Sequence, residues 1–90
     1  MRAIITVLGK DNVGIIYNVT KIVSERGVNI LDISQTVLQD DVFAMFMLVD
    51  VAEIDVEYKK MAAELQKYGE EAGYSIHVQR EDVFDAMHRI

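Results

Sequence analysis

The sequence predicts an α+β fold in which a four-stranded antiparallel sheet carries two helices on one face. Four runs with the patterning of strands and two amphipathic runs follow one another in the order β-α-β-β-α-β. The first and third strand runs are apolar on both faces, which is typical of central strands. Right-handed crossovers place those same two runs at the centre of the sheet. The 90 residues contain no linker, so residues 1–90 are predicted to form a single domain.

The first strand and the first helix are separated by a glycine turn. A β-branched, apolar run at residues 2–8 predicts the strand, and Gly9 ends it. Apolar residues then recur at helical spacing, at Ile15, Ile16, Val19, Ile22 and Val23. A side-chain oxygen of Asp11 or Asn12 can cap the start of this helix, and Gly27 supplies the left-handed residue that stops it.

The next two runs predict a pair of strands, at residues 28–39 and 42–50, joined by a tight turn at Gln39-Asp40-Asp41. Alternation in the second strand places Asn29, Leu31, Ile33, Gln35 and Val37 on one face, and Ile30, Asp32, Ser34, Thr36 and Leu38 on the other. The third strand is apolar on both faces, with Phe43, Met45, Met47 and Val49 opposite Val42, Ala44, Phe46 and Leu48.

The last part of the chain predicts a second helix, an edge strand and a terminal helix. Residues 56–72 form an amphipathic pattern that Asp55 can cap and Gly73 stops. Residues 74–80 alternate cleanly, with Tyr74, Ile76 and Val78 facing inward, as expected of an edge strand with one covered face. Residues 81–90 are predicted to form a short helical extension that docks on the domain.

Two helices cover only one face of such a sheet. The opposite face would still carry apolar side chains from three strands, and this patch exceeds what monomers usually expose. A partner surface, a ligand or the terminal helix must therefore cover part of it. The apolar fraction of 51% is also high for a short chain, so we expect self-association at micromolar concentration.

Composition excludes several classes of function. The net charge of −6 and the scattered basic residues argue against direct binding of nucleic acid. The absence of cysteine excludes a disulfide framework, a thiolate nucleophile and a CxxC metal site. Every apolar run is shorter than the ~18 residues of a membrane span, and no signal peptide is recognisable, so we expect a cytoplasmic protein.

Candidates for catalysis or metal binding are weak. His77 and His88 lie on a strand and on the terminal helix without a convergent partner, which is typical of surface histidines. Asp40 and Asp41 form a carboxylate pair, but a tight turn favours aspartate for structural reasons. We therefore predict no catalytic residue, no metal site and no cofactor.

The turn from Gly9 to Ile15 is the most specific feature of the chain, since a strand that feeds a helix start presents free backbone N–H groups. Such a turn can hold a small anion or a carboxylate. The same residues are equally explained as a capped strand-to-helix turn, with Asn29 simply beginning a strand. The residues alone leave both interpretations open.

The sequence resembles the ACT domain over residues 1 to about 80. The resemblance rests on three segments, Gly9-Lys10-Asp11-Asn12-Val13-Gly14-Ile15, Gly27-Val28-Asn29-Ile30-Leu31-Asp32-Ile33-Ser34-Gln35 and Phe43-Ala44-Met45-Phe46-Met47 with Val49-Asp50. It is strongest to small stand-alone ACT proteins and to the ACT domains of glycine-cleavage-system transcriptional repressors. Val13 replaces a proline that is common in the motif, and no attached catalytic or DNA-binding domain is recognisable.

The resemblance implies a ferredoxin-like βαββαβ sandwich that forms a homodimer and binds a small effector at the interface between subunits. It implies ligand contacts at Asp11, Asn12, Val13, Gly14, Ile15, Asn29, Ile30 and Leu31, with no catalytic activity. The function expected is that of an allosteric, amino-acid-binding regulatory protein that acts on a separate regulated protein. The alternative is a protein–protein interaction module that uses the open sheet face and has no small-molecule ligand.

Overall fold

The computed structural model describes residues 1–10, 14–51 and 56–82. The elements are, in chain order, β1 (Arg2–Gly9), α1 (Ile15–Glu25), β2 (Asn29–Val37), a 3-10 turn η1 (Gln39–Asp41), β3 (Phe43–Asp50), α2 (Val56–Ala72) and β4 (Ser75–Arg80). The strands form one sheet in the order β2-β3-β1-β4, and every neighbouring pair is antiparallel. The predicted fold class is therefore confirmed, and β1 and β3 are the central strands.

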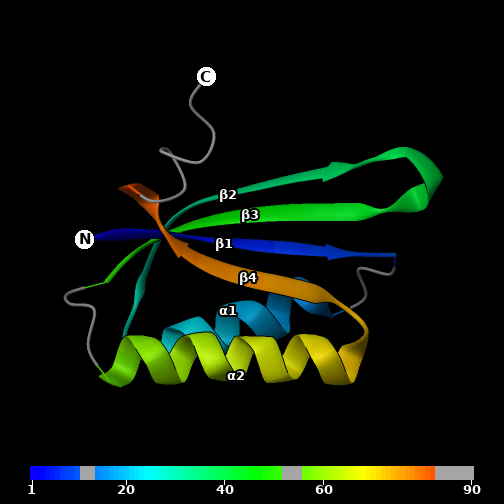
Figure 1. Cartoon of the computed structure of the whole chain (residues 1–90). Coiled ribbons are helices and arrows are strands. Elements are labelled where there is room, and N and C mark those ends of the chain that lie inside the picture. The colour runs from blue at the N-terminus through cyan, green and yellow to red at the C-terminus, as the bar shows by residue number, and fades with distance from the viewer. Residues whose placement is uncertain (11–13, 52–55, 83–90) are drawn as a thin grey trace.

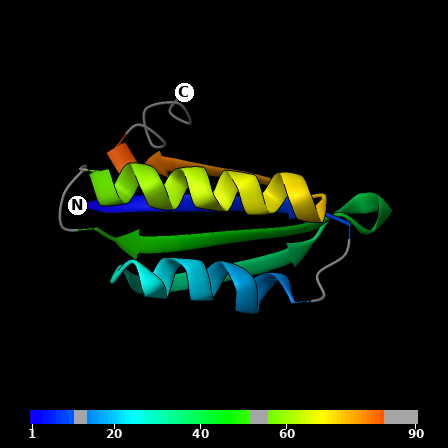
Figure 2. The same ribbon diagram turned by 90° about the horizontal axis from the view of Figure 1, so that it is seen from below.

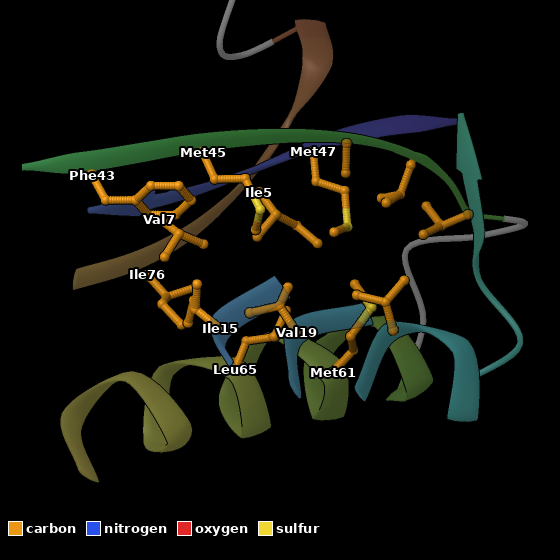
Figure 3. Close-up of a cluster of buried hydrophobic side chains, with 14 residues drawn as sticks. Ile5, Val7, Ile15, Val19, Phe43, Met45, Met47, Met61, Leu65 and Ile76 are labelled. Carbon is orange, nitrogen blue, oxygen red and sulfur yellow. The ribbon is translucent and has the colours of Figure 1, made fainter. Parts of the chain in front are cut away.

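Both helices cover the same face of the sheet, α1 beside β2 and α2 beside β4 (Figures 1 and 2). The core fills the space between the two layers, where inward-facing residues of β1 and β3 meet the apolar stripes of α1 and α2 (Figure 3). Alternate residues of these two strands are fully or almost fully buried: Ala3, Ile5, Val7, Phe43, Met45, Met47 and Val49. The other side of the sheet has no helix over it among the described residues, and we refer to it as the open face.

The predicted stops of both helices are confirmed. Gly27, two residues after α1, has φ 71, and Gly73, directly after α2, has φ 84. Both values lie in the left-handed region, where a residue without Cβ is strongly favoured. The turn between β2 and β3 also forms as predicted, and Asp40 and Asp41 have φ 63 and 61, which aspartate tolerates better than most residues. The predicted Asp55 cap and residues 83–90 of the predicted terminal helix lie outside the described residues.

The prediction of which residues of β2 share a face was wrong at the start of the strand. Asn29 pairs with Asp50 and Ile30 with Val49, but the next pair is Asp32 with Leu48, so Leu31 is an extra residue in a β-bulge. The bulge reverses the alternation. Ile30 therefore packs against the core on the same face as Ile33, although the predicted alternation placed the two on opposite faces. Asn29 lies on the open face with its register partners, whereas the predicted alternation grouped it with Ile33.

Candidate functional site

The start of α1 is the first part of the predicted site that the structure describes. Gly14 occupies the N-cap position with φ 73, and no described side chain caps the helix. Its carbonyl accepts the backbone N–H of Asn18 at 2.9 Å, so the N–H groups before Asn18 have no partner within the helix. These donors and the positive end of the helix dipole favour a carboxylate or another small anion.

Asn18 is a polar residue at this helix start that the sequence interpretation missed. Its side-chain amide donates to the Gly14 carbonyl at 2.8 Å and is partly exposed. The signal was present in the sequence, because a residue four positions after the N-cap lies one turn above it. Asn18 can therefore offer both an amide donor and an amide oxygen beside the free N–H groups.

The structure limits what the predicted residues of this turn can do. Asp11, Asn12 and Val13 lie outside the described residues. Gly14 is exposed, but the Ile15 side chain is fully buried in the core. Ile15 can therefore contact a ligand only through its backbone N–H.

The second group of predicted residues lies at the other end of the sheet. Asn29 is in register with Asp50 of β3, and Asp50 is in register with Arg2 at the start of β1. Gly9, from which the chain continues toward α1, is seven residues further along β1, which corresponds to roughly 23 Å at the rise of a strand. One chain therefore does not bring Asn29, Ile30 and Leu31 together with Gly14 and Ile15.

The β2 side of the molecule carries most of the exposed large apolar side chains. Val37 is 66% exposed, Leu38 50% and Leu31 44%, and all three lie on or directly after β2. Tyr17 of α1, the helix beside β2, is 68% exposed. Because β2 is an edge strand, its outer backbone groups are also free to pair with another strand.

The open face contains a hollow of about 320 Å³. It is lined by Ile4, Asp32, Ser34, Phe46, Leu48 and Glu81, which come from three strands and from the residue after β4. Phe46 is 38% exposed at this hollow. The expectation that the open face carries uncovered apolar groups is met by the described part of the chain.

A serine and a histidine meet on β4. Ser75 Oγ and His77 Nε2 lie 3.0 Å apart and are exposed, as residues two apart on one face of a strand can be. The sequence interpretation named no such pair. Glu70 lines the same surface pocket as this pair, but among the described residues no hydrogen bond joins its carboxylate to the imidazole, as the third group that orients a catalytic histidine would require.

Residues 1–10, 14–51 and 56–82 were compared with the geometry of a metal site and of a membrane-spanning helix. No three histidine or acidic side chains there are grouped as metal ligands would be. None of the helices in those ranges is long and apolar enough to cross a membrane.

Comparison with known proteins identifies relatives over nearly the whole chain. A family model described as ACT domain matches residues 2–79. A UPF0237 protein from Methanopyrus kandleri is 53% identical over 89 residues, which are 99% of this chain and 98% of the relative. The solved structure of an ACT domain protein from Streptococcus pneumoniae is 40% identical, superimposes with a TM-score of 0.80, and covers 98% of each chain. The regulatory subunit of aspartate kinase from Thermus flavus has the same fold, with a TM-score of 0.64 and 23% identity over 88% of this chain and 51% of that one.

Proposed function

The chain belongs to the ACT domain family, and we propose that it is a regulatory module that binds a small molecule, with an amino acid as the first candidate. A structural neighbour of the same fold is described as the regulatory subunit of an enzyme, so the fold serves regulation elsewhere. We further propose that this module acts on a separate protein, and that it has no catalytic activity of its own.

The observation that carries the proposal is the separation of the two predicted contact groups. Asn29 and Gly14 lie at opposite ends of the sheet within one chain, so a pocket built from both needs a second copy. We propose a homodimer in which two β2 edges pair antiparallel about a two-fold axis and extend the sheet. The start of one β2 then lies beside the end of its partner, and α1 of the partner begins at that same end.

The exposed apolar groups favour this arrangement. Leu31, Val37 and Leu38 on the β2 side, together with Tyr17 of the neighbouring helix, would lose solvent contact in such a dimer. A β2–β2 junction also satisfies the free backbone groups of an exposed edge.

The chemistry of the proposed pocket suits an amino acid. Free N–H groups before Asn18 would bind the carboxylate, and the amide oxygens of Asn18 and Asn29 would accept from the ammonium group. Because Asn29 lies on the open face and α1 on the opposite face, the two groups would share a ligand around the ends of the strands. The side chain bound there would point toward the exposed Leu31.

Calorimetry of the full chain against the twenty amino acids tests the ligand proposal. We expect one or a few of them to bind, and we expect Asn18→Ala and Asn29→Ala each to weaken binding. Gln66→Ala on α2, far from both contact groups, is the matched amide control and should leave the affinity unchanged. A dimer that binds none of the twenty would contradict the proposal.

The second candidate is an interaction module that docks a partner protein on the open face. The hollow beside the exposed Phe46 is the observation that favours it. The two candidates differ at Asn29, because its replacement should weaken ligand binding but leave docking on the hollow intact.

A further inference from the structure

A groove runs along the outer side of β4, between this strand and α2. It consists of two cavities, of about 260 and 300 Å³. Gln66 of α2 and Ile76 and His77 of β4 line both cavities, so the two adjoin one another. Ala62 lines only the first cavity and Glu70 only the second, so the groove extends over about two turns of α2.

The strand that forms one wall of this groove is an edge strand without the usual protection against pairing. β4 lies at the end of the sheet beside β1, with α2 running along it (Figure 1). Its register with β1 runs without a bulge from Ser75 to Arg80, and the sequence contains no proline. Bulges and prolines are among the devices by which edge strands avoid the addition of another strand. The outer edge of β4 therefore offers backbone N–H and C=O groups to an added strand.

The wall formed by α2 has nearly the period of an extended chain. Ala62, Gln66 and Glu70 are four residues apart and form one row, with about 6 Å of helix rise between successive members. Alternate residues of a strand point to the same face and are about 6.6 Å apart. Three alternate residues of an added strand would therefore meet these three side chains in turn, and the groove fits an extended segment of about five residues.

The side chains of this row determine which segment the groove suits. Glu70 is exposed, and no residue in the described part of the chain pairs with its carboxylate. A lysine or arginine of the segment would complement this charge, and the net charge of −6 also favours a basic partner. Gln66 offers an amide donor and acceptor to a polar side chain, and the small Ala62 leaves room for an apolar one.

The order of these contacts gives the segment a direction. The cavity beside Glu70 is also lined by Ser75, the first residue of β4, and the cavity beside Ala62 by Gln79, near the end of the strand. Antiparallel pairing is the more stable arrangement, and an antiparallel segment runs from the Ala62 end to the Glu70 end. We therefore expect an apolar, a polar and a basic residue at alternate positions, in that order from the N-terminus.

The polar character of this edge favours a peptide over a second copy of the chain. Exposed large apolar side chains gather on the β2 side, at Leu31, Val37 and Leu38. The β4 edge instead exposes Ser75 and His77, and stable interfaces between identical subunits are more apolar than that. In the proposed dimer the two β4 edges lie at the outer ends of the extended sheet, where each remains accessible.

We propose that the groove between β4 and α2 binds an extended, basic segment of another protein, which adds to β4 as a fifth strand. Backbone hydrogen bonds to β4 hold the segment, and Ala62, Gln66 and Glu70 contact its alternate side chains. The inference rests on the proposed function in one respect, since it names the surface by which the module meets a separate protein. It requires neither the amino acid nor the β2 junction.

Nuclear magnetic resonance of the isotope-labelled full chain tests the proposal with one probe peptide, acetyl-Thr-Val-Thr-Gln-Thr-Lys-Thr-amide. Its valine, glutamine and lysine take the three positions on the helix side, and threonine, which is favourable in strands, fills the others. We expect millimolar peptide to shift the amide signals of β4 and of the Ala62–Glu70 row, and to leave those of the β2 edge in place. Unchanged β4 signals, or shifts confined to β2, would overturn the proposal.

Charge reversal tests the ionic contact. Glu70→Lys should weaken binding of the peptide about fivefold, or about 1 kcal/mol, because an exposed attraction becomes a repulsion. Glu71→Lys makes the same change in net charge at a neighbouring exposed residue that lines neither cavity, and it should leave the affinity nearly unchanged. A peptide with glutamate in place of lysine should bind the Glu70 variant better than it binds the natural chain. Equal affinities of the two variants for the lysine peptide would contradict the assigned contact.

Methylation of the peptide's backbone nitrogens tests whether the segment adds as a strand. Alternate N–H groups of an added strand point toward β4 and the others point away. Methylating one alternate set should therefore abolish binding, whereas methylating the other set should not, and equal tolerance of both would rule out strand addition. β4 signals that shift with protein concentration in the absence of peptide would also overturn the proposal, because a second copy would then occupy the edge.

Calorimetry with amino acids separates this proposal from the proposed ligand site. A chain that binds an amino acid but not the peptide would refute strand addition alone. A chain that binds the peptide with the expected dependence on Glu70, but binds none of the twenty amino acids, would support strand addition and refute the ligand site.

Discussion

Val37→Lys is the substitution that most directly tests the proposed dimer. Val37 lies at the end of the edge strand β2 and is 66% exposed in the single chain. Its replacement should therefore have little effect on the stability of the monomer. In the proposed dimer the same position meets the start of the partner's β2, so a lysine there would place a charge at the junction.

The size of the effect follows from the exposed fraction. Complete burial of an aliphatic side chain contributes at least about 1.5 kcal/mol, so the exposed two-thirds of Val37 can still contribute about 1 kcal/mol. Because the dimer is two-fold symmetric, each subunit contributes one Val37, and the two together contribute about 2 kcal/mol to the stability of the dimer. Since 1.4 kcal/mol corresponds to a factor of ten, the dissociation constant should rise about 30-fold.

Sedimentation velocity over a concentration series measures that constant. Phe46→Lys is the matched control, because it replaces an exposed apolar side chain of the open face, away from the β2 edge. The control should leave the dissociation constant unchanged. The reasoning is refuted if Val37→Lys has no effect while Phe46→Lys produces monomers, because the copies would then meet through the open face.

Two further predictions concern packing and titration. Gly69→Ala should destabilise the fold by about 1 kcal/mol in urea unfolding. The added Cβ would lie 2.8 Å from the Tyr74 carbonyl oxygen. Relieving this overpacking costs about 1–3 kcal/mol, which outweighs the gain of about 1 kcal/mol in helix propensity. Ala63→Gly, on the exposed side of α2, measures that propensity term in place, and a stabilised Gly69→Ala would refute the argument. Burial raises the pKa of the Tyr58 hydroxyl above its usual 10.0, and the Arg80 charge opposes this shift only in part. The contribution of Tyr58 to the stability of the fold should therefore be fully present below pH 10 and be lost as the pH rises through the pKa in the folded state. Thermal unfolding between pH 8 and 11 should therefore decline less steeply for Tyr58→Phe than for the natural chain.

The sheet was predictable because its central strands leave little ambiguity. β1 and β3 are apolar on both faces, so neither tolerates an edge position, and the alternation of each strand assigns its inward residues directly. The glycines at 27 and 73 mark helix ends for a purely steric reason. These signals are local and act over a few residues, which is why they can be recognised without the fold.

The facing of β2 was not predictable in the same way. The bulge at Leu31 contains no glycine and interrupts a run that alternates acceptably in either register. What decides the register is the pairing with β3, because Ile30 must lie beside Val49 for its side chain to reach the core. This is a long-range constraint, and the strand alone does not contain it.

The arrangement of the site could have been deduced from topology. In a β-α-β unit the helix returns along the strand, so the residues after β1 and the residues that begin β2 must lie at opposite ends of the sheet. Contact residues that neighbour one another in a family motif need not therefore neighbour one another in one chain. The resemblance grouped Gly14 with Asn29, whereas the register separates them by most of the length of β1.

This separation links ligand binding to assembly. If Gly14 of one copy and Asn29 of the other hold the same ligand, the ligand binds the dimer and not the monomer, so by linkage it must tighten the dimer by the factor by which dimerisation tightens the ligand. Val37→Lys should then weaken the apparent affinity for the amino acid at low protein concentration, although Val37 itself need not touch the ligand. Raising the protein concentration about 30-fold should restore the affinity of the variant, because mass action compensates for the weaker dimer. If the affinity fails to recover once sedimentation shows the variant to be dimeric, the pocket does not depend on the β2 junction. If the variant binds the amino acid normally as a monomer, one chain is enough to form the site, and a pocket shared by Gly14 and Asn29 of two copies is ruled out.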